Sequence, residues 1–189
     1  MTLAQDIREA VSVMKRGGLI AYPTDTIWGI GCDATCPEAV RRVFEVKHRA
    51  DSKALITLVS SREMLLNHVG TIAPEALDVA LNSPRPTTVV FPNGVGVAAE
   101  LLAADGSIGI RLTREAYSAG LCEALGAPIV STSANISGEP SPRFFDEISA
   151  EVLASVDYVA RYRRADHTPS LPSRVVMIGG DGIMKVIRP

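Results

Sequence analysis

Cysteine and aromatic side chains are scarce in this sequence. Its 189 residues include three cysteines, one tryptophan, four tyrosines and four phenylalanines. Cys32 and Cys36 have no second Cys or His pair at zinc-ligand spacing, so the sequence predicts neither a zinc site nor a disulfide framework. We expect the cysteines to be free thiols in a reducing compartment.

An excess of one charge and long hydrophobic runs are also absent. Lys and Arg number 19 against 21 Asp and Glu, for a net charge of −2, so a nucleic-acid role would need a local basic patch. Nowhere do about eighteen apolar residues follow one another, and the first residues mix charged and apolar types. We therefore expect neither export nor membrane insertion, and we place the protein in the cytoplasm.

Common catalytic and nucleotide-binding fingerprints are missing too. The sequence has no Gly-x4-Gly-Lys-Ser/Thr loop, and no Gly-x-Gly-x-x-Gly turn opens a helix after a strand. No serine lies in Gly-x-Ser-x-Gly, which argues against a hydrolase elbow. The three histidines have neither metal spacing nor a nucleophilic partner. An anion site in this protein must therefore be built in another way.

Helical and strand patterns alternate along the chain. Thr2 and Gln5 form a capping-box pattern before a helical run of apolar residues that the glycines at residues 17–18 end. Further helices are expected from Thr35, from Ser60, over residues 114–125 and over residues 144–156. Strands are expected at residues 19–22, 27–31, 55–59, 87–92, 107–112, 129–130, 158–159, 174–178 and 183–187. This alternation predicts one α/β domain over residues 1–189, with a mixed sheet that ends in a hairpin.

Residues 128–141 form the stretch that is richest in binding groups. Ile129 and Val130 predict a short buried strand, and small hydroxyl and amide residues follow until the chain turns at Gly138. Hydroxyls, an amide and open backbone N–H groups let an anion approach the main chain, so phosphate or carboxylate suits this loop. The alternative is a turn that satisfies only its own backbone, because Ser, Asn and Gly dominate ordinary turns.

Two further features are basic. Lys47, Arg49 and Lys53 lie within seven residues, and such a cluster can stabilise a polyphosphate and its leaving pyrophosphate. The alternative is a solvated basic face, because helix C-termini attract cations. Arg111 follows an apolar run, and the alternative for it is a strand-edge arginine in a surface ion pair.

Four stretches taken together resemble a known family. They are residues 17–26 (Gly-Gly-Leu-Ile-Ala-Tyr-Pro-Thr-Asp-Thr), the pattern Lys47-x-Arg49-x-x-x-Lys53, residues 109–111 (Gly-Ile-Arg) and residues 131–138 (Ser-Thr-Ser-Ala-Asn-Ile-Ser-Gly). In this order they are similar to the YrdC/TsaC family, the threonylcarbamoyl-AMP synthases. The resemblance extends from Gly17 to Arg188. It implies the short, single-domain form, an α/β protein whose twisted open mixed sheet has flanking helices and a positively lined cavity.

The resemblance implies a reaction and its partners. L-threonine, bicarbonate and ATP would give threonylcarbamoyl-AMP and pyrophosphate, with Mg²⁺ sharing the neutralisation of charge. A downstream threonylcarbamoyl transferase complex would use the product to modify adenosine 37 of tRNAs. The alternative is an RNA-binding module of the same family, in which the cavity tracks the backbone of tRNA or double-stranded RNA during RNA or ribosome maturation. The negative net charge and the scarcity of aromatic residues argue against that alternative.

Each matching residue also takes an implied role. Lys47 and Arg49 would be catalytic. The residues implied in ATP binding are Arg49, Lys53, Ser133, Asn135, Ser141 and Arg188. The residues implied in threonine binding are Thr26, Arg111, Ser131 and Ser173, with Arg111 as the partner of the carboxylate. No residue is assigned to a metal.

Four positions depart from the family's pattern without removing a charged ligand. Ala54 and Thr113 stand where the family usually has proline, Arg85 stands for glycine in a Pro-Gly-Pro turn, and Arg174 stands for threonine. These changes affect loop geometry and the alignment of Ser173. Arg85 would either narrow the cavity or add a cation to its rim.

Overall fold

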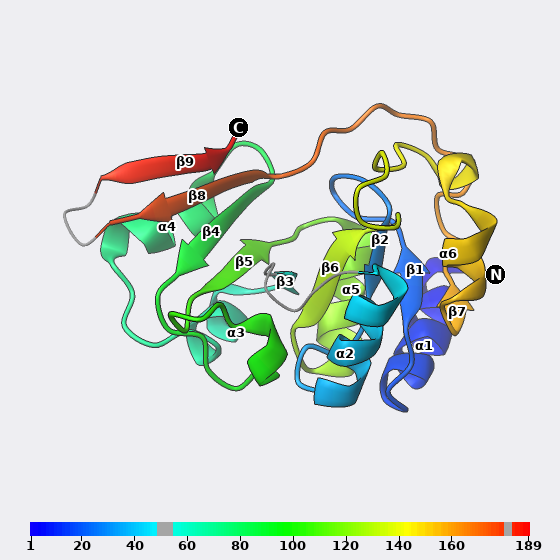
Figure 1. Cartoon of the computed structure of the whole chain (residues 1–189), viewed down its shortest axis with the longest axis horizontal. Coiled ribbons are helices and arrows are strands. Elements are labelled where there is room, and N and C mark those ends of the chain that lie inside the picture. The colour runs from blue at the N-terminus through cyan, green and yellow to red at the C-terminus, as the bar shows by residue number, and fades with distance from the viewer. Residues whose placement is uncertain (49–54, 180–182) are drawn as a thin grey trace.

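The computed structural model of this protein describes residues 1–48, 55–179 and 183–189. The described residues form a mixed sheet in the order β7-β1-β2-β6-β3-β5-β4-β8-β9 (Figure 1). The strands are β1 (Ile20–Tyr22), β2 (Gly29–Gly31), β3 (Ile56–Val59), β4 (Thr87–Phe91), β5 (Ile108–Leu112), β6 (Ile129–Ser133), β7 (Tyr158–Val159), β8 (Arg174–Ile178) and β9 (Met184–Arg188). The helices are α1 (Leu3–Met14), α2 (Pro37–Val46), α3 (Arg62–Asn67), α4 (Pro74–Asn82), α5 (Ala116–Leu125) and α6 (Ala150–Ala154), with the 3-10 turns η1 (Ala99–Leu101) and η2 (Phe145–Glu147). The expected α/β class and mixed open sheet are confirmed.

Strand register places polar residues from distant parts of the chain on one face of the sheet. Ile56 of β3 lies opposite both Ser131 of β6 and Gly109 of β5. Thr88 of β4 lies opposite Val175 of β8. Directly opposed residues point to the same face, and alternate residues of one strand share a face. The hydroxyls of β4 and β6 therefore line the same side as Gly109, whose missing side chain leaves room above the sheet.

The opposite face of the sheet is apolar and covered by helices. Ile110 and Val89 are paired in register, are fully buried, and belong to a hydrophobic cluster that includes Ala76 and Ala80 of α4. A second cluster joins β1, β2 and β6 to α1, α2 and α5. Burial of these apolar faces supplies most of the stabilisation, as is usual for layered α/β folds.

Helices α1 and α5 pack closely because a glycine lies between them. A Cβ atom at Gly120 would come within 2.6 Å of Ile7 Cδ1, so no larger residue fits there without a shift of Ile7. The N-terminus of α1 is closed by a capping box, in which Gln5 N donates to Thr2 Oγ1 at 3.2 Å and Thr2 N donates to Gln5 Oε1 at 2.8 Å. The predicted start of this helix is confirmed.

A long connection crosses the molecule from β7 to β8. In Figure 1 it is the orange segment that passes over the sheet from the side of α6 to the side of β9. It comprises residues 160–173, and it is attached midway where Ser170 Oγ donates to the carbonyl of Thr26. This segment brings Ser173 to the start of β8, beside β4 and at the opposite end of the strand order from β7.

Several local expectations need correction. The middle of the chain contains α4, which the sequence patterns did not indicate, and the helix expected over residues 144–156 is divided into η2 and α6. Ser149 caps α6 by accepting from Val152 N at 3.3 Å, which explains the division. The N-cap position of α2 is Cys36 rather than Thr35, and its side chain makes no capping hydrogen bond. Helix α3 is capped by Ser61 rather than Ser60. Among the described residues, no helix is long and apolar enough to cross a membrane.

Candidate active site

A cavity of ≈ 280 Å³ lies on the polar face of the sheet, and its lining carries a positive charge. It is lined by ends or middles of β2, β3, β4, β5, β6, β8 and β9 and by the crossing segment. Seven sequence-predicted residues line it: Thr26, Arg111, Ser131, Ser133, Ser141, Ser173 and Arg188. The described part of the lining contains two arginines and no Asp or Glu. An anion is therefore the ligand that this cavity suits electrostatically.

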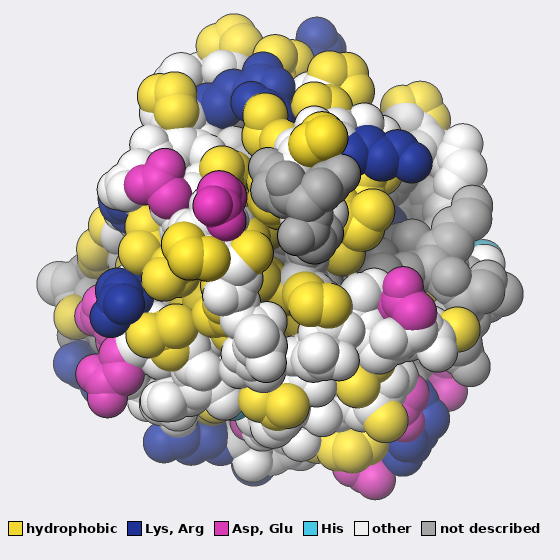
Figure 2. Space-filling view, turned by 90° about the vertical axis from the view of Figure 1, so that its left-hand side faces the viewer, with side chains coloured by type: hydrophobic (Ala, Val, Ile, Leu, Met, Phe, Trp, Pro, Cys, Tyr) yellow, Lys and Arg dark blue, Asp and Glu magenta, His cyan; other side chains and the backbone are white. Residues whose placement is uncertain are grey.

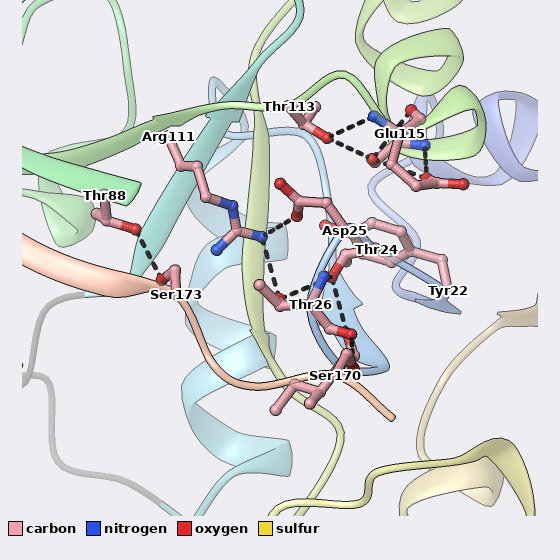
Figure 3. Close-up of polar contacts among 12 residues, drawn as sticks. Tyr22, Thr24, Asp25, Thr26, Thr88, Arg111, Thr113, Glu115, Ser170 and Ser173 are labelled. Carbon is pink, nitrogen blue, oxygen red and sulfur yellow. Dashed lines mark hydrogen bonds and ion pairs between the residues drawn. The ribbon is translucent and has the colours of Figure 1, made fainter. Parts of the chain in front are cut away.

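Arg111 lies at the end of β5 and is 2% exposed. Its Nη2 atom is 2.9 Å from Asp25 Oδ1 and donates to Thr26 Oγ1 at 3.5 Å (Figure 3). The contact with Asp25 is an ion pair whose angle is too bent for a hydrogen bond, since Asp25 Oδ1 has no hydrogen-bond partner. Arg111 Nε is also buried without a partner among the described residues. The alternative of a strand-edge arginine in a surface ion pair is therefore wrong.

A second polar group lies across the cavity from Thr26. Ser173 Oγ and Thr88 Oγ1 are 3.0 Å apart and both residues are buried. Arg188 donates from Nη2 to the carbonyl of Ser173 at 2.8 Å and to its hydroxyl at 3.1 Å. Arg174 thus follows Ser173 without displacing it from the cavity, although the family usually has threonine at residue 174. The sequence did not single out Thr88, because a threonine inside a strand pattern gives no functional signal.

The positive charge of Arg111 acts on the second arginine of the cavity, Arg188. Partial burial, followed by the positive charge of Arg111, holds the pKa of the Arg188 guanidinium below its ordinary value. Each cause acts against the charged form. A bound anion would relieve the repulsion between these two cations, so the cavity is electrostatically suited to one.

Lys47 lies beneath the polar loop that follows β6. It is 2% exposed, and its Nζ atom donates to Ser133 O at 2.7 Å and to Asn135 Oδ1 at 2.7 Å. It also contacts Ser133 Oγ at 3.3 Å and the Asn135 carbonyl. Asn135 Nδ2 donates to Glu139 O at 2.7 Å, which closes the loop. Neither Lys47 nor Asn135 is among the residues that line the cavity.

Four further residues that the sequence singled out are not found in the described lining of the cavity. Arg49 and Lys53 lie outside the described residues, as does Ala54. Arg85 lines a separate pocket of ≈ 180 Å³ together with Arg114 and Asp25, so it neither narrows the main cavity nor adds a cation to its described lining. Trp28 lines the main cavity and was not predicted there, because an isolated aromatic residue near a strand is more typical of a core.

The side of the molecule that carries β9 mixes residue types. Figure 2 shows hydrophobic side chains there among scattered Lys, Arg, Asp and Glu. Exposed apolar residues of this region are Met177, Ile183, Met184, Val186 and Ile187. The described residues on this face form no continuous basic surface, so the face does not favour the RNA-binding alternative.

Known proteins are similar to this chain in sequence and in fold. Residues 12–189 match the Sua5_yciO_yrdC family model, which is described as telomere recombination. The threonylcarbamoyl-AMP synthase of Xanthomonas euvesicatoria pv. vesicatoria (strain 85-10) is 36% identical over 162 residues, which make up 84% of this chain and 87% of that protein. A second such synthase, from Xanthomonas campestris pv. campestris (strain B100), is 35% identical over 157 residues, or 82% and 84% of the two chains.

Solved structures agree. P. abyssi Sua5 complexed with L-threonine has 27% identity and a TM-score of 0.86, and the match covers 98% of this chain and 54% of the Sua5 chain. E. coli YciO has 25% identity and a TM-score of 0.80, with 98% and 89% covered. This chain thus spans about half the length of Sua5 and most of the length of YciO. Since the family model reaches from the first helix to the last residue, the protein belongs to the Sua5/YciO/YrdC family.

Proposed function

We propose that this protein is a threonylcarbamoyl-AMP synthase, which forms threonylcarbamoyl-AMP and pyrophosphate from L-threonine, bicarbonate and ATP. The observation that carries the proposal is the cavity itself. The lining combines the guanidinium groups of Arg111 and Arg188 with the hydroxyls of Thr26, Ser131 and Ser173. Its described residues include no carboxylate. Both proposed organic substrates are anionic or carry a carboxylate. The family and the curated relatives named for this activity support the same reaction.

The proposed chemistry needs no protein nucleophile. The amine of threonine adds to bicarbonate or CO₂ to give a carbamate, and water is released when bicarbonate is the source. A carbamate oxygen then attacks the α-phosphorus of ATP, and the bond from that phosphorus to the bridging oxygen breaks as pyrophosphate leaves. The protein contributes by holding two anionic reactants in line and by neutralising the charge that develops on pyrophosphate.

On the threonine side, we assign the carboxylate to Arg111. Its guanidinium is buried, its Nε atom has no partner among the described residues, and it lines the cavity. Guanidinium groups bind carboxylates with two parallel hydrogen bonds when their edge is accessible. Thr26, Ser131 and Ser173 line the same cavity and would hold the remaining polar groups of the amino acid.

On the nucleotide side, the proposed ligands are Ser133, Ser141 and Arg188 in the cavity, Asn135 beside it, and Arg49 and Lys53. The last two lie outside the described residues, so their contacts with phosphate stay predictions. Lys47 stays a predicted catalytic residue. Its Nζ atom donates to the loop that carries Ser133 and Asn135, so in the free protein its described contacts hold the shape of this loop.

Mg²⁺ is expected to accompany the phosphates of ATP. Among residues 1–48, 55–179 and 183–189 no group of three His, Cys, Asp or Glu side chains could hold a metal ion. The described lining also lacks the carboxylates that Mg²⁺ usually uses as protein ligands. The described residues therefore do not fit a resident magnesium site, and we assign no step to the metal.

The product defines the next partner. Threonylcarbamoyl-AMP is a mixed anhydride and an acyl donor, so a transferase that moves the threonylcarbamoyl group to tRNA must consume it. We infer that this protein works in the cytoplasm with a downstream threonylcarbamoyl transferase complex.

Pyrophosphate release provides the direct test of the proposed function. Purified protein with Mg²⁺ and ATP should release pyrophosphate only when L-threonine and bicarbonate are both present, because the carbamate is the nucleophile. L-serine and L-valine serve as control amino acids in parallel reactions. Equal release of pyrophosphate without threonine would show that the reaction is a different one.

A further inference from the structure

Asp25 forms the most buried ion pair among the described residues. Its side chain is 16% exposed, the side chain of Arg111 is 3% exposed, and the two atoms Oδ1 and Nη2 are 2.9 Å apart. A buried arginine without a counter-ion carries a large desolvation penalty, so such a partner has both structural and electrostatic consequences.

A rigid corner of the backbone holds Asp25 in place. Thr26 N donates to Thr24 Oγ1 at 3.0 Å, and Thr24 Oγ1 donates to Ile27 O at 2.8 Å. The two threonine hydroxyls are 2.9 Å apart. Since the Thr24 hydroxyl proton is used on Ile27, Thr26 Oγ1 donates to Thr24 and keeps a lone pair for Arg111. Ser170 Oγ ties the same corner to the crossing segment through the carbonyl of Thr26.

Asp25 contacts Arg111 from the side away from the cavity. Arg111 lines the main cavity, whereas Asp25 lines the second pocket and is absent from the lining of the first. In Figure 3 the Nη2 end of the guanidinium points to Asp25 and Thr26, and its other end points toward the side of Ser173. Asp25 therefore fixes one end of the guanidinium without occupying the space where a ligand would bind.

We infer that Asp25 is a positioning residue for amino-acid recognition, because it orients Arg111 so that the remaining N–H groups of the guanidinium meet the substrate carboxylate. The inference rests on the proposed function, in which Arg111 binds that carboxylate. A guanidinium recognises a carboxylate through two parallel hydrogen bonds, so a rotation of its plane weakens the contact even though the positive charge remains.

A purely structural role for Asp25 predicts a different result. It would lower stability and reduce the binding of every ligand of the site to a similar extent. A positioning role is selective for one group of one ligand, the carboxylate of threonine. L-threonine amide lacks that carboxylate and keeps the rest of the molecule, so it provides the comparison.

The experiment measures the binding of L-threonine and of L-threonine amide by calorimetry to wild-type protein and to Asp25→Asn. The variant keeps an oxygen acceptor at this position and loses the charge. We expect the Kd of L-threonine to rise about tenfold in Asp25→Asn and that of the amide to change less than about twofold, within the coupling range of contacting residues. In a double-mutant cycle with Arg111→Ala, Asp25→Asn should then have almost no further effect on L-threonine.

Asp157→Asn is the matched control. Asp157 pairs with Arg42 at 2.9 Å, and neither residue lines the cavity. We expect this variant to bind both ligands as the wild type does. If Asp25→Asn fails to fold, Asp25→Glu keeps the charge but moves the carboxylate, and it should show the same selective loss for L-threonine.

The outcomes separate this inference from the proposed function. Wild-type protein that binds neither L-threonine nor its amide contradicts the proposed function. Normal wild-type binding of L-threonine, together with equal losses for both ligands or no loss in the folded Asp25 variant, overturns the positioning role and leaves the proposed function standing.

Discussion

At the scale of single residues, charge and its compensation distinguish the cavity. Arg111 has a carboxylate partner behind it in Asp25, while Arg188 donates to the neutral Ser173. Both cations face a space whose described lining offers no negative side chain. Each of the two arginines lowers the free energy of a bound anion. Removal of one arginine should therefore weaken the binding of the ligand group that it faces.

Variants of Arg111 and Ser133 should separate the two substrates. Arg111→Ala should raise the KM for threonine roughly ten- to a hundredfold, the worth of about 1.5–3 kcal/mol for a hydrogen bond to a charged group. Its effect on the KM for ATP should be much smaller. Ser133→Ala should raise the KM for ATP more than the KM for threonine, because Ser133 lies in the loop assigned to the nucleotide.

Separate titrations of threonine and ATP in the pyrophosphate assay check this division. Circular dichroism first establishes that each variant is folded, since Arg111→Ala leaves Asp25 without its partner. If both variants changed both KM values to the same extent, the division of the cavity into two halves would be wrong.

At the scale of elements, the contact between the end of α2 and the loop after β6 shapes the site. Lys47 is the C-cap residue of α2, and its ammonium group reaches acceptors on Ser133 and Asn135. The backbone adds a further bond, in which Ser137 N donates to Lys47 O at 3.0 Å. These contacts hold Lys47 beside Ser133 and Asn135, which lie 86 and 88 positions away from it in the sequence.

Lys47→Met should therefore reduce stability more than an exposed lysine change does. Loss of the ammonium group removes a charged donor from oxygens of Ser133 and Asn135. Ser133 O still accepts from Asn135 N, and Asn135 Oδ1 still accepts from Ser133 Oγ. These donors are neutral, so the free energy of unfolding should fall by about 1–3 kcal/mol. Lys15→Met is the control, since Lys15 is exposed at the end of α1. Urea unfolding followed by circular dichroism measures the stability of both variants. Equal unfolding midpoints for the two would contradict a stabilising contact between Lys47 and the loop after β6.

At the scale of the whole molecule, two hydrophobic clusters lie under the helices and the cavity face stays polar. Cys32 and Cys122 are fully buried in one of these clusters, whereas Cys36 is partly exposed. Burial raises the pKa of the Cys122 thiol to about 12 and that of Cys32 well above its ordinary value. The thiolate is the reactive form, so both buried thiols are protected by inaccessibility and by their protonation state.

Alkylation with iodoacetamide at pH 8 should therefore distinguish the three cysteines. Cys36 should react within minutes in the folded protein, while Cys32 and Cys122 should react only when urea unfolds the chain. The slow reaction of Cys32 and Cys122 follows from their raised pKa values, because both thiols stay protonated at pH 8 in the folded state. Mass spectrometry of peptides locates the label, and rapid labelling of Cys122 without urea would refute the packing described for this cluster.

Local patterns in the sequence predicted much of the fold. The capping box at Thr2, the paired glycines at residues 17–18 and the apolar strand runs act over a few residues, so they can be recognised without tertiary information. Helix α4 was missed because its N-cap residue, Ala73, has no side chain that could cap the helix, and its short apolar pattern resembles a loop. The caps of α2 and α3 were displaced by one residue, as helix ends depend on which backbone N–H groups lack other partners.

Short sequence motifs are enough to predict the family, the α/β class and seven of the residues that line the cavity, because they carry the residue types that the chemistry needs. Tertiary structure alone decided how those residues face one another. Arg111 and Thr26 are 85 positions apart, as are Thr88 and Ser173, and only strand register and the crossing segment bring them together. It also placed Asp25 behind Arg111 and Arg85 on another pocket, because side-chain direction depends on the packing of distant strands rather than on neighbours in sequence.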